Sequence, residues 1–274
     1  MKRNLYLWVE YEGANYQGWQ TQAAAPTIQG ELERVLSAEL GELVKVRGAG
    51  RTDAGVHALG QAANCFVRSD LPARAILHRA NRALPDDIVI RKVLDAPVEF
   101  SARRHALLRH YQYRAVNRPM APALDRRTWA HLPLPLDRDR LAHAVALFAG
   151  PHEFAAFRSS ACRARRTALT MERSRLTVDG DRLIFDFSCR SFLHKMVRIL
   201  VGTALDVARG RIAPAQLERL LAGEGDRSQA GRTVPPEGLI LLGIQYAEPY
   251  REFDTINGRN ASPARAVGEK PLHA

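Results

Sequence analysis

Runs of apolar residues along the chain predict eight β-strands. The first run, residues 5–11, is rich in aromatic and β-branched side chains, which favour extended structure. Asp179 and Gly180 separate two later runs and predict the turn of a hairpin. The predicted strands cover residues 5–11, 44–46, 61–67, 88–93, 111–116, 176–178, 183–189 and 239–246.

Apolar residues spaced three and four apart predict five helices. Thr27 is a typical cap for the start of the first helix, and Gly41 is typical of a helix end. Gly150 and Gly210 predict the ends of two later helices in the same way. The predicted helices cover residues 28–40, 72–84, 137–148, 191–208 and 213–222.

The order of these elements predicts an α+β fold with two subdomains. Each half mixes strands and helices in a pattern that favours antiparallel sheets. We therefore divide the chain into an N-terminal α+β subdomain over residues 1–102 and a C-terminal α+β subdomain over residues 103–248. A cleft between two such subdomains is a natural place for a site. Residues 249–274 are rich in Pro, Gly and Ala and predict a flexible tail.

Composition excludes several classes of protein. With 46% apolar and 25% charged residues, the chain is typical of a globular protein. No stretch approaches about 18 consecutive apolar residues, and the apolar run after Arg3 is too short for a signal peptide. The three cysteines have no CxxC spacing, which argues against a disulfide framework or a thiolate metal site and indicates a cytoplasmic protein.

The basic residues are unevenly distributed. They outnumber the acidic residues by 40 to 29, which gives a net charge of +11, and 35 of the 40 are Arg. Five arginines and no acid lie between Arg103 and Arg118, and six arginines with one acid lie between Arg158 and Arg175. A codon preference for Arg would spread these residues along the chain, whereas clustering favours a polyanion-binding face.

Residues 48–57, with the sequence GAGRTDAGVH, carry the candidate chemistry. The segment has no Gly-Lys-Ser/Thr ending, so it is not a nucleotide P-loop, and Asp53 stands where a dinucleotide fingerprint needs glycine. A carboxylate in a glycine-rich loop after a strand can be held forward toward a ligand. An Asx turn in a tight connection is the structural alternative.

The segment Gly50–His57 resembles the catalytic motif of the tRNA pseudouridine synthase A family. Further segments that are similar to this family follow in chain order over residues 5–246, so the resemblance implies a pseudouridine-synthase-like fold. These segments are Glu10-Tyr11-x-Gly13, Gly18-Trp19-Gln20, Asn81-x-x-Leu84-Pro85-x-Asp87-Ile88, Phe100-x-Ala102-Arg103, Tyr111-x-Tyr113, His152-x-Phe154-x-x-Phe157-Arg158, Phe192 to Arg198 with Gly202, and Pro235 to Leu239.

The resemblance implies that the chain converts uridine into pseudouridine in the anticodon stem-loop of tRNA, at tRNA positions 38, 39 and 40. In that reaction the N1–C1′ bond breaks, the uracil turns, and C5 bonds to C1′. Because substrate and product are isomers, the reaction needs no cofactor. The resemblance also implies a homodimer that binds tRNA.

The resemblance further implies a role for individual residues. Asp53 is the catalytic carboxylate, either as a nucleophile at the sugar or the base or as the promoter of a glycal intermediate. Arg198 is the basic partner that keeps a carboxylate ionised, and Tyr111 stacks on the uracil and helps to remove the C5 proton. Arg51 helps to hold the target nucleotide out of the base stack. The expected contacts to the RNA backbone are Arg103, Arg158, Arg163, Arg165 and Arg166, and no metal ligands are expected.

Two other functions are compatible with parts of the sequence. A glycosidase-like hydrolase of nucleosides usually needs two carboxylates, and the chain offers no convincing second one beside Asp53. A non-catalytic RNA-binding protein on the same fold would keep the arginine windows. It would have no reason to keep Asp53, Tyr111 and Arg198 together.

Overall fold

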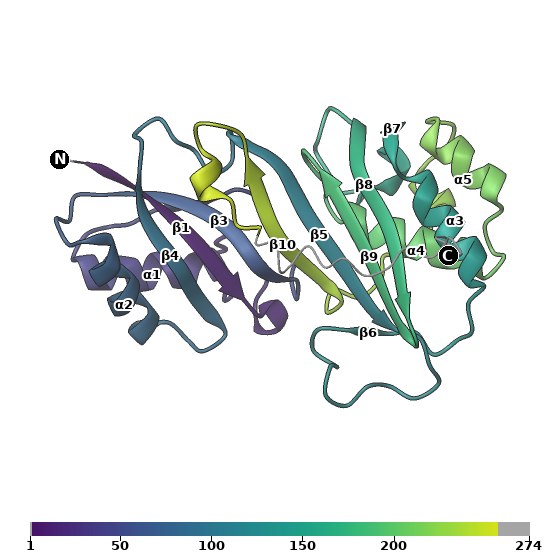
Figure 1. The fold of residues 1–274 in the computed structure, drawn as a ribbon, viewed down its shortest axis with the longest axis horizontal. Coiled ribbons are helices and arrows are strands. Elements are labelled where there is room, and N and C mark those ends of the chain that lie inside the picture. The colour runs from purple at the N-terminus through teal and green to yellow at the C-terminus, as the bar shows by residue number, and fades with distance from the viewer. Residues whose placement is uncertain (1, 257–274) are drawn as a thin grey trace, which may run out of the picture. The chain divides into compact units, whose positions relative to one another are not determined.

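The computed structural model describes residues 2–256, and the described chain divides into two compact units. Unit 1 contains residues 2–109 and 240–256, and unit 2 contains residues 110–239. The chain therefore returns to unit 1 after it has completed unit 2. Figure 1 shows the elements that make up each unit.

Unit 1 is a sheet whose strands follow the order β4-β1-β3-β10, with β2 paired to β3. β1, β2, β3 and β4 pair antiparallel, while β10 runs parallel to β3. Figure 1 shows α1 and α2 together on one face of this sheet. The bounds are β1 (Arg3–Tyr11), α1 (Ile28–Leu40), β2 (Val46–Gly48), β3 (His57–Val67), α2 (Ala73–Ala83), β4 (Ile88–Ala96) and β10 (Leu239–Tyr246).

Both faces of the unit 1 sheet are covered. Residues 4–9 of β1 are all buried, although their side chains alternate between the two faces. On one face the ring of Tyr6 contacts the rings of Phe100 and Phe253. A strand that is buried on both sides has a nearly continuous apolar sequence, which is the pattern of residues 5–9.

The chain after β10 packs on unit 1. Phe253 and Thr255 are fully buried, and the Thr255 hydroxyl donates a hydrogen bond to the Gly60 carbonyl at 2.7 Å. The Tyr6 hydroxyl donates to the Phe253 carbonyl at 2.8 Å. The sequence predicted a flexible tail from residue 249, but residues 249–256 have this ordered packing; the remainder of the predicted tail, 257–274, lies outside the described residues.

Unit 2 contains strands in the order β5-β9-β8-β7, with β6 paired to β5. β8 and β9 form an antiparallel hairpin whose turn contains Gly180 at a φ of 57°. Figure 1 shows α3, α4 and α5 gathered on one side of these strands. The bounds are β5 (Ala106–Val116), β6 (Ala130–His131), α3 (Arg138–Leu147), β7 (Gly150–Glu153), β8 (Ala168–Asp179), β9 (Arg182–Cys189), α4 (Met196–Ala208) and α5 (Pro214–Leu221).

The α+β class predicted from the sequence is confirmed. Thr27 caps α1 through its side chain, which accepts a hydrogen bond from the Gly30 amide, and Gly41 ends the helix in the left-handed conformation. The predicted helix over 191–208 begins later, at Met196, because Lys195 has a φ of 61° and interrupts the helical backbone. Four short 3-10 helices also occur in the described chain: Gly13–Asn15, Ala155–Phe157, Arg227–Gln229 and Arg251–Phe253.

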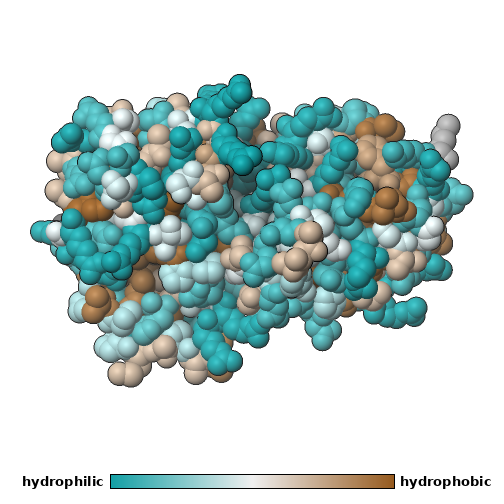
Figure 2. Space-filling view, turned by 180° about the vertical axis from the view of Figure 1, so that it is seen from behind, coloured by the Kyte–Doolittle hydropathy of each residue, from teal (hydrophilic) through white to brown (hydrophobic). Residues whose placement is uncertain are grey.

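None of the helices between residues 2 and 256 is both long and apolar enough to cross a membrane. Figure 2 shows a mostly hydrophilic face on which hydrophobic residues form small separate patches.

Candidate active-site loop and its supports

Asp53 lies in the loop that joins β2 to β3 in unit 1. The Asp53 side chain is half-buried, Arg51 is exposed, and Thr52 between them is buried. The Val56 amide donates to the Asp53 carbonyl at 3.2 Å, which closes a tight turn. The loop therefore turns the Thr52 side chain inward. The Arg51 guanidinium and, in part, the Asp53 carboxylate stay accessible to a ligand.

Buried hydrogen bonds hold the inner side of this loop. The Thr52 and Tyr11 hydroxyl oxygens are 2.8 Å apart and share a hydrogen bond. The Gln61 amide donates to the Gly50 carbonyl at 3.1 Å and to the Tyr11 oxygen at 3.5 Å. Burial raises the pKa of Tyr11 well above its ordinary value, so its hydroxyl stays protonated and keeps the network intact.

The N-terminal loop packs directly against the Asp53 loop. The Trp19 amide donates to the Thr52 carbonyl at 3.1 Å, and the Gly55 amide donates to the Tyr16 carbonyl at 3.3 Å. Gly18 has a φ of 87°, and a Cβ atom there would lie 2.6 Å from the Thr52 carbonyl oxygen. Only glycine fits this backbone and this close approach, which explains why Gly18 accompanies the loop that carries Asp53.

His57 adds a further hydrogen bond between the N-terminal loop and the end of the Asp53 loop. It is 3% exposed, and its Nδ1 atom accepts a hydrogen bond from the Gly13 amide at 3.1 Å. An acceptor Nδ1 atom does not carry a proton. His57 therefore links β3 to the N-terminal loop as a structural residue. Among residues 2–256 there is no group of three or more His, Cys, Asp or Glu side chains placed to hold a metal ion.

Arg109 supports the Asp53 loop from the side. Its Nη2 atom donates to the Ala49 carbonyl at 2.8 Å and to the Arg103 carbonyl at 3.2 Å. Ala49 directly precedes the Gly50–Arg51 pair, so one guanidinium joins the beginning of the Asp53 loop to the segment that carries the exposed Arg103 side chain.

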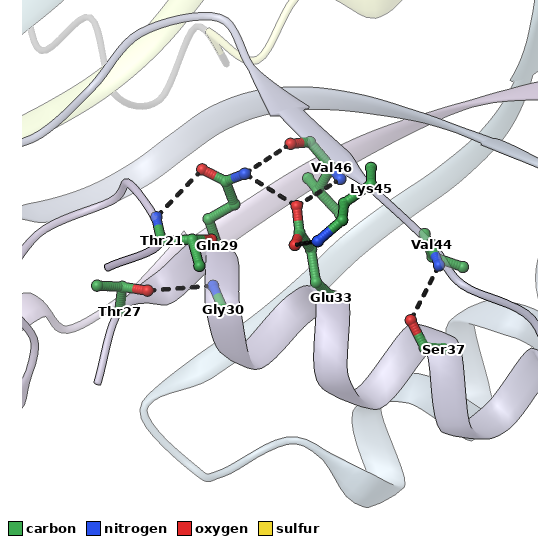
Figure 3. Close-up of polar contacts among 9 residues, drawn as sticks. All are labelled: Thr21, Thr27, Gln29, Gly30, Glu33, Ser37, Val44, Lys45 and Val46. Atoms are coloured by element: carbon green, nitrogen blue, oxygen red, sulfur yellow. Dashed lines mark hydrogen bonds and ion pairs between the residues drawn. The ribbon is translucent and has the colours of Figure 1, made fainter. Parts of the chain in front are cut away.

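A second network holds β2 against α1, as Figure 3 shows. Glu33 is a buried residue with 8% of its surface exposed. Its carboxylate accepts hydrogen bonds from the Val46 amide at 3.0 Å and from the Lys45 ammonium at 3.0 Å. The Gln29 side chain donates to the Val46 carbonyl at 3.0 Å and to Glu33 at 2.9 Å. Because β2 is only three residues long, these contacts fix the position from which the Asp53 loop starts.

In unit 2, Tyr111 lies on β5 and is 8% exposed. Its ring meets that of Phe192 edge to face, with the ring centroids 5.1 Å apart. Edge-to-face contact fixes the plane of an aromatic ring, so Tyr111 is held in one orientation.

Arg198 lies on α4 and is half-buried. Its Nε atom donates to the Val234 carbonyl at 2.8 Å, while the Val234 amide donates back to the Arg198 carbonyl at 3.2 Å. The segment that contains Val234 lies very close to α4, because a Cβ atom on Gly202 would overlap the Arg232 carbonyl. The reciprocal bonds set the direction of the Arg198 side chain.

The Tyr113 hydroxyl extends this support by donating to the Pro235 carbonyl at 3.0 Å. Burial raises the pKa of Tyr113 well above its ordinary value, so the hydroxyl remains a donor. Tyr113 therefore fixes the chain that follows Val234.

Most of the predicted RNA-contacting arginines are exposed. Arg163, Arg165 and Arg166 lie in the loop between the Ala155–Phe157 helix and β8. The half-buried Arg158 donates to the Ala164 carbonyl at 2.8 Å and so braces this loop from inside. The Ser159 amide also donates to the His194 carbonyl at 2.9 Å, which attaches the loop to the turn before α4.

Other arginines of the two windows have partners within the chain. Arg118 pairs with Asp181 at 3.2 Å, and Arg173 lies 4.0 Å from Asp186. Arg114 is half-buried and donates to the Gln112 side chain at 2.6 Å. The positive charge available to an external polyanion is therefore smaller than the number of arginines in residues 103–118 and 158–175 suggests.

Sequence reasoning missed Arg109, Tyr11, Gln61 and Glu33 as supports of the site. Arg109 was included in the charge of the first window, although its spacing of two from Tyr111 places both side chains on one face of β5. The polar residues Gln61 and Glu33 interrupt apolar patterns at positions that are buried. A buried polar residue in an apolar run was the available signal, because such a residue needs hydrogen-bond partners.

A family model described as tRNA pseudouridine synthase matches residues 7–103 and 144–247 of the chain. Arg51, Asp53 and Arg103 lie within the first matched range, and Arg198 lies within the second. Tyr111 falls between the two ranges.

Curated relatives are similar over most of the chain. The tRNA pseudouridine synthase A of Geotalea uraniireducens (strain Rf4) is 41% identical over 244 residues, which is 89% of this chain and 100% of the relative. The protein of the same name from Acetivibrio thermocellus is 39% identical over 244 residues, with the same two coverages of 89% and 100%. The one from Methylococcus capsulatus is 40% identical over 246 residues, which is 89% of this chain and 90% of the relative.

Proposed function

The chain belongs to the tRNA pseudouridine synthase family, and from this membership we propose that it isomerises uridine to pseudouridine in the anticodon stem-loop of tRNA with Asp53 as the catalytic carboxylate. The observation that carries the proposal is the Asp53 loop itself. Hydrogen bonds with Tyr11, Trp19 and Arg109 hold the loop, and Asp53 within it is half-buried and so partly exposed to solvent.

The chemistry asks for an ionised carboxylate beside the ribose of the target. In the covalent route Asp53 attacks C1′ and the electrons of the N1–C1′ bond leave with the uracil. After the uracil turns, C5 bonds to C1′, the bond to Asp53 breaks, and the proton lost from C5 is balanced by one gained at N1. In the glycal route the carboxylate instead promotes loss of the uracil through a sugar intermediate. Both routes return an isomer of the substrate.

The roles of the other residues follow from the family pattern. Arg51 is exposed two residues before Asp53 and suits a contact that keeps the target nucleotide out of the stack. We assign Tyr111, whose ring is fixed by Phe192, to stacking on the uracil and to removal of the C5 proton. We assign Arg198, whose direction is set by Val234, to stabilisation of the ionised carboxylate.

We assign the backbone contacts to the exposed arginines. Arg163, Arg165 and Arg166 project from one loop, and Arg103 is exposed beside the Arg109 support. Arg158 braces that loop and contributes through its position. Contacts of this kind recognise the shape and phosphates of RNA more than its sequence.

We further propose tRNA positions 38, 39 and 40 as targets, action in the cytoplasm and a homodimer. Cys65, Cys162 and Cys189 form no disulfide within the described chain, which suits a reducing compartment. A homodimer needs exposed apolar residues at its interface. The apolar residues 239–242 are buried within the chain and so are not available to a second subunit. Met120, Leu124 and Leu134 are exposed in one segment of unit 2 and are available. Light scattering on the purified chain, with Leu124→Ser as the variant, tests the homodimer; a monomer in the wild type overturns it.

The decisive experiment uses unmodified tRNA with tritium at uridine C5. A synthase releases tritium to water and leaves the RNA chain intact, whereas a hydrolase yields free uracil and an abasic site. A non-catalytic RNA-binding protein does neither.

The matched variant is Asp53→Asn, which keeps the side-chain shape but cannot be ionised. We expect tritium release to be abolished while tRNA affinity stays within a few fold of the wild type. A loss of binding equal to the loss of activity would contradict the catalytic assignment.

A further inference from the structure

Unit 1 carries a basic groove that the proposed chemistry does not use. Its volume is about 470 Å3, and it lies where the start of β1, the end of β3 and the segment leading into β2 meet. Four of its residues are cationic and one is aromatic. The lining residues are Lys2, Lys45, Arg47, Arg68, Phe66, Leu43 and Glu42.

The strand register explains why these side chains meet. Arg47 pairs with Asn64 across β2 and β3, and Phe66 pairs with Asn4 across β1 and β3. Because residues two apart on a strand share a face, Asn64 and Phe66 point the same way. Arg47 and Phe66 therefore lie on one face of the sheet.

The groove has a surplus of positive charge. The Glu42 carboxylate accepts hydrogen bonds from the Arg68 and Ser69 amides at 2.7 and 3.0 Å, and Glu33 pairs with Lys45. Within residues 2–256, the side chains of Lys2, Arg47 and Arg68 make no ion pair with a carboxylate. These three side chains are exposed, so their charge is available to an external anion.

Phe66 makes the groove more than an anion site. The Lys2 ammonium lies over its ring, 5.3 Å from the centroid, and the ring is only partly buried. Grooves that combine cations with an accessible aromatic ring are typical of nucleic-acid binding, because phosphates contact the cations and bases or riboses contact the ring.

The groove is close enough to the Asp53 loop to meet the same RNA. Arg47 precedes Asp53 by six residues, and a fully extended chain of that length spans at most about 22 Å. β2 leads from the groove straight into the loop, and the network around Glu33 in Figure 3 fixes that strand to α1.

We propose that this groove, formed by Lys2, Arg47, Arg68 and Phe66, binds the sugar–phosphate backbone of the substrate RNA next to the target uridine. This inference rests on the proposed function, because it takes the RNA held by the Asp53 loop as the occupant. The groove is a binding element, and it acts on affinity and not on the chemical step.

The test is a triple variant, Lys2→Gln with Arg47→Gln and Arg68→Gln. The matched control removes three exposed arginines from α2 in the same unit, Arg74→Gln with Arg79→Gln and Arg82→Gln. Dissociation constants for unmodified tRNA are measured from low to physiological salt, together with tritium release at saturating enzyme. Phe66→Leu is tested in parallel as the variant that keeps the charge.

We expect the groove variant to bind tRNA about tenfold or more weakly at low salt. The slope of log affinity against log salt should become shallower by about 2 to 3, since each phosphate contact adds about 0.7 to 0.9. Phe66→Leu should weaken binding without changing the slope. The rate of tritium release at saturation should stay at the wild-type value in both groove variants.

Affinity and slope equal to those of the α2 control would overturn the inference. It would also be overturned if polyglutamate bound the wild type and the α2 control but not the groove variant while all three proteins bound tRNA equally, because the groove would then be a site for acidic peptides. A wild-type protein that binds tRNA through the groove but releases no tritium would refute the proposed function alone.

Discussion

Arg109 shows how the partners of a single side chain determine its role. By charge it belongs to the first arginine window, but its guanidinium donates to the Ala49 and Arg103 carbonyls within unit 1. Hydrogen bonds from a charged donor contribute about 1.5 to 3 kcal/mol each. Arg109 is therefore a positioning residue for the Asp53 loop.

Replacing Arg109 should impair the chemical step more than RNA binding. We expect Arg109→Ala to lower the single-turnover rate of tritium release by about tenfold or more, because the loss of about 1.5 to 3 kcal/mol in loop contacts misplaces the carboxylate. Arg109→Lys should recover only part of the rate, since one ammonium cannot reproduce the planar fork of a guanidinium.

The control is the exposed neighbour Arg104→Ala, which should leave the rate at saturation unchanged. If Arg109→Ala instead weakened tRNA binding, made the salt dependence shallower and left the saturated rate intact, Arg109 would be a phosphate contact and not a positioning residue.

At the scale of elements, the end of β10 and the segment that follows it complete unit 1. The Tyr246 hydroxyl donates to the Ala102 carbonyl at 2.8 Å, and His105 stacks on Tyr250 with the ring centroids 4.6 Å apart. The same segment places the Asp254 carboxylate where it accepts a hydrogen bond from the Tyr246 amide at 2.6 Å. Residues near the end of the described chain thus hold the segment that carries Arg103.

Asp254 gives this element a pH dependence. Burial raises the pKa of its carboxyl, although the Tyr246 amide and Arg251 oppose the shift. A carboxyl whose pKa is higher in the folded than in the unfolded protein lowers the free energy of unfolding once it is ionised. This loss of stability grows as the pH rises from the pKa of the unfolded protein to the pKa of the folded protein. Asp254→Asn keeps an acceptor oxygen, and we expect it to raise Tm at neutral pH, on the order of 1–3 °C.

That gain should disappear below the pKa values of Asp254, where both proteins are neutral at this position. Asp254→Ala removes the acceptor and should lower Tm at every pH. Thermal unfolding of the three proteins across the acid range measures both effects. A gain in Asp254→Asn that increased toward acidic pH would show that burial does not control this carboxyl.

For the whole molecule, the net charge of +11 describes the charge open to an external polyanion only coarsely. Arg118 and Arg173 have acidic partners within the chain. Arg163, Arg165 and Arg166 in the loop at residues 158–167 are exposed, and hydrogen bonds from the Ser159 amide and the half-buried Arg158 hold that loop in place. A loop that is fixed but carries exposed cations suits contact with phosphates.

Neutralising that loop should change the salt dependence of tRNA binding. We expect Arg163→Gln with Arg165→Gln and Arg166→Gln to make the slope of log affinity against log salt shallower by about 2 to 3. The equally charged control is Arg138→Gln with Arg140→Gln and Arg219→Gln, all exposed on helices of unit 2. An identical slope in both variants would indicate that the Arg content reflects codon usage and not RNA binding.

Much of the fold and of the candidate site follows from the sequence alone, because the underlying signals are local. The predicted helices 28–40, 72–84, 137–148 and 213–222 agree with α1, α2, α3 and α5 to within one residue at each end. The predicted strands 61–67, 111–116 and 176–178 are too short, because β3, β5 and β8 begin at residues 57, 106 and 168, where polar residues interrupt the apolar pattern. The start of α4 was missed, because the left-handed backbone at Lys195 has no signature in a non-glycine residue. The short strands β6 and β7 were missed as well, since two and four residues carry no periodicity.

The candidate chemistry was also visible in the sequence, since the residues around Asp53 form one contiguous segment. What only the tertiary structure decided is which distant residues hold that segment in place. Tyr11, Gln61 and Arg109 come from three different strands, and their bonds to the Asp53 loop depend on strand pairing. The tertiary structure likewise separated the arginines that carry exposed charge from those that brace the backbone, because hydrogen-bond partners far apart in sequence leave no local pattern.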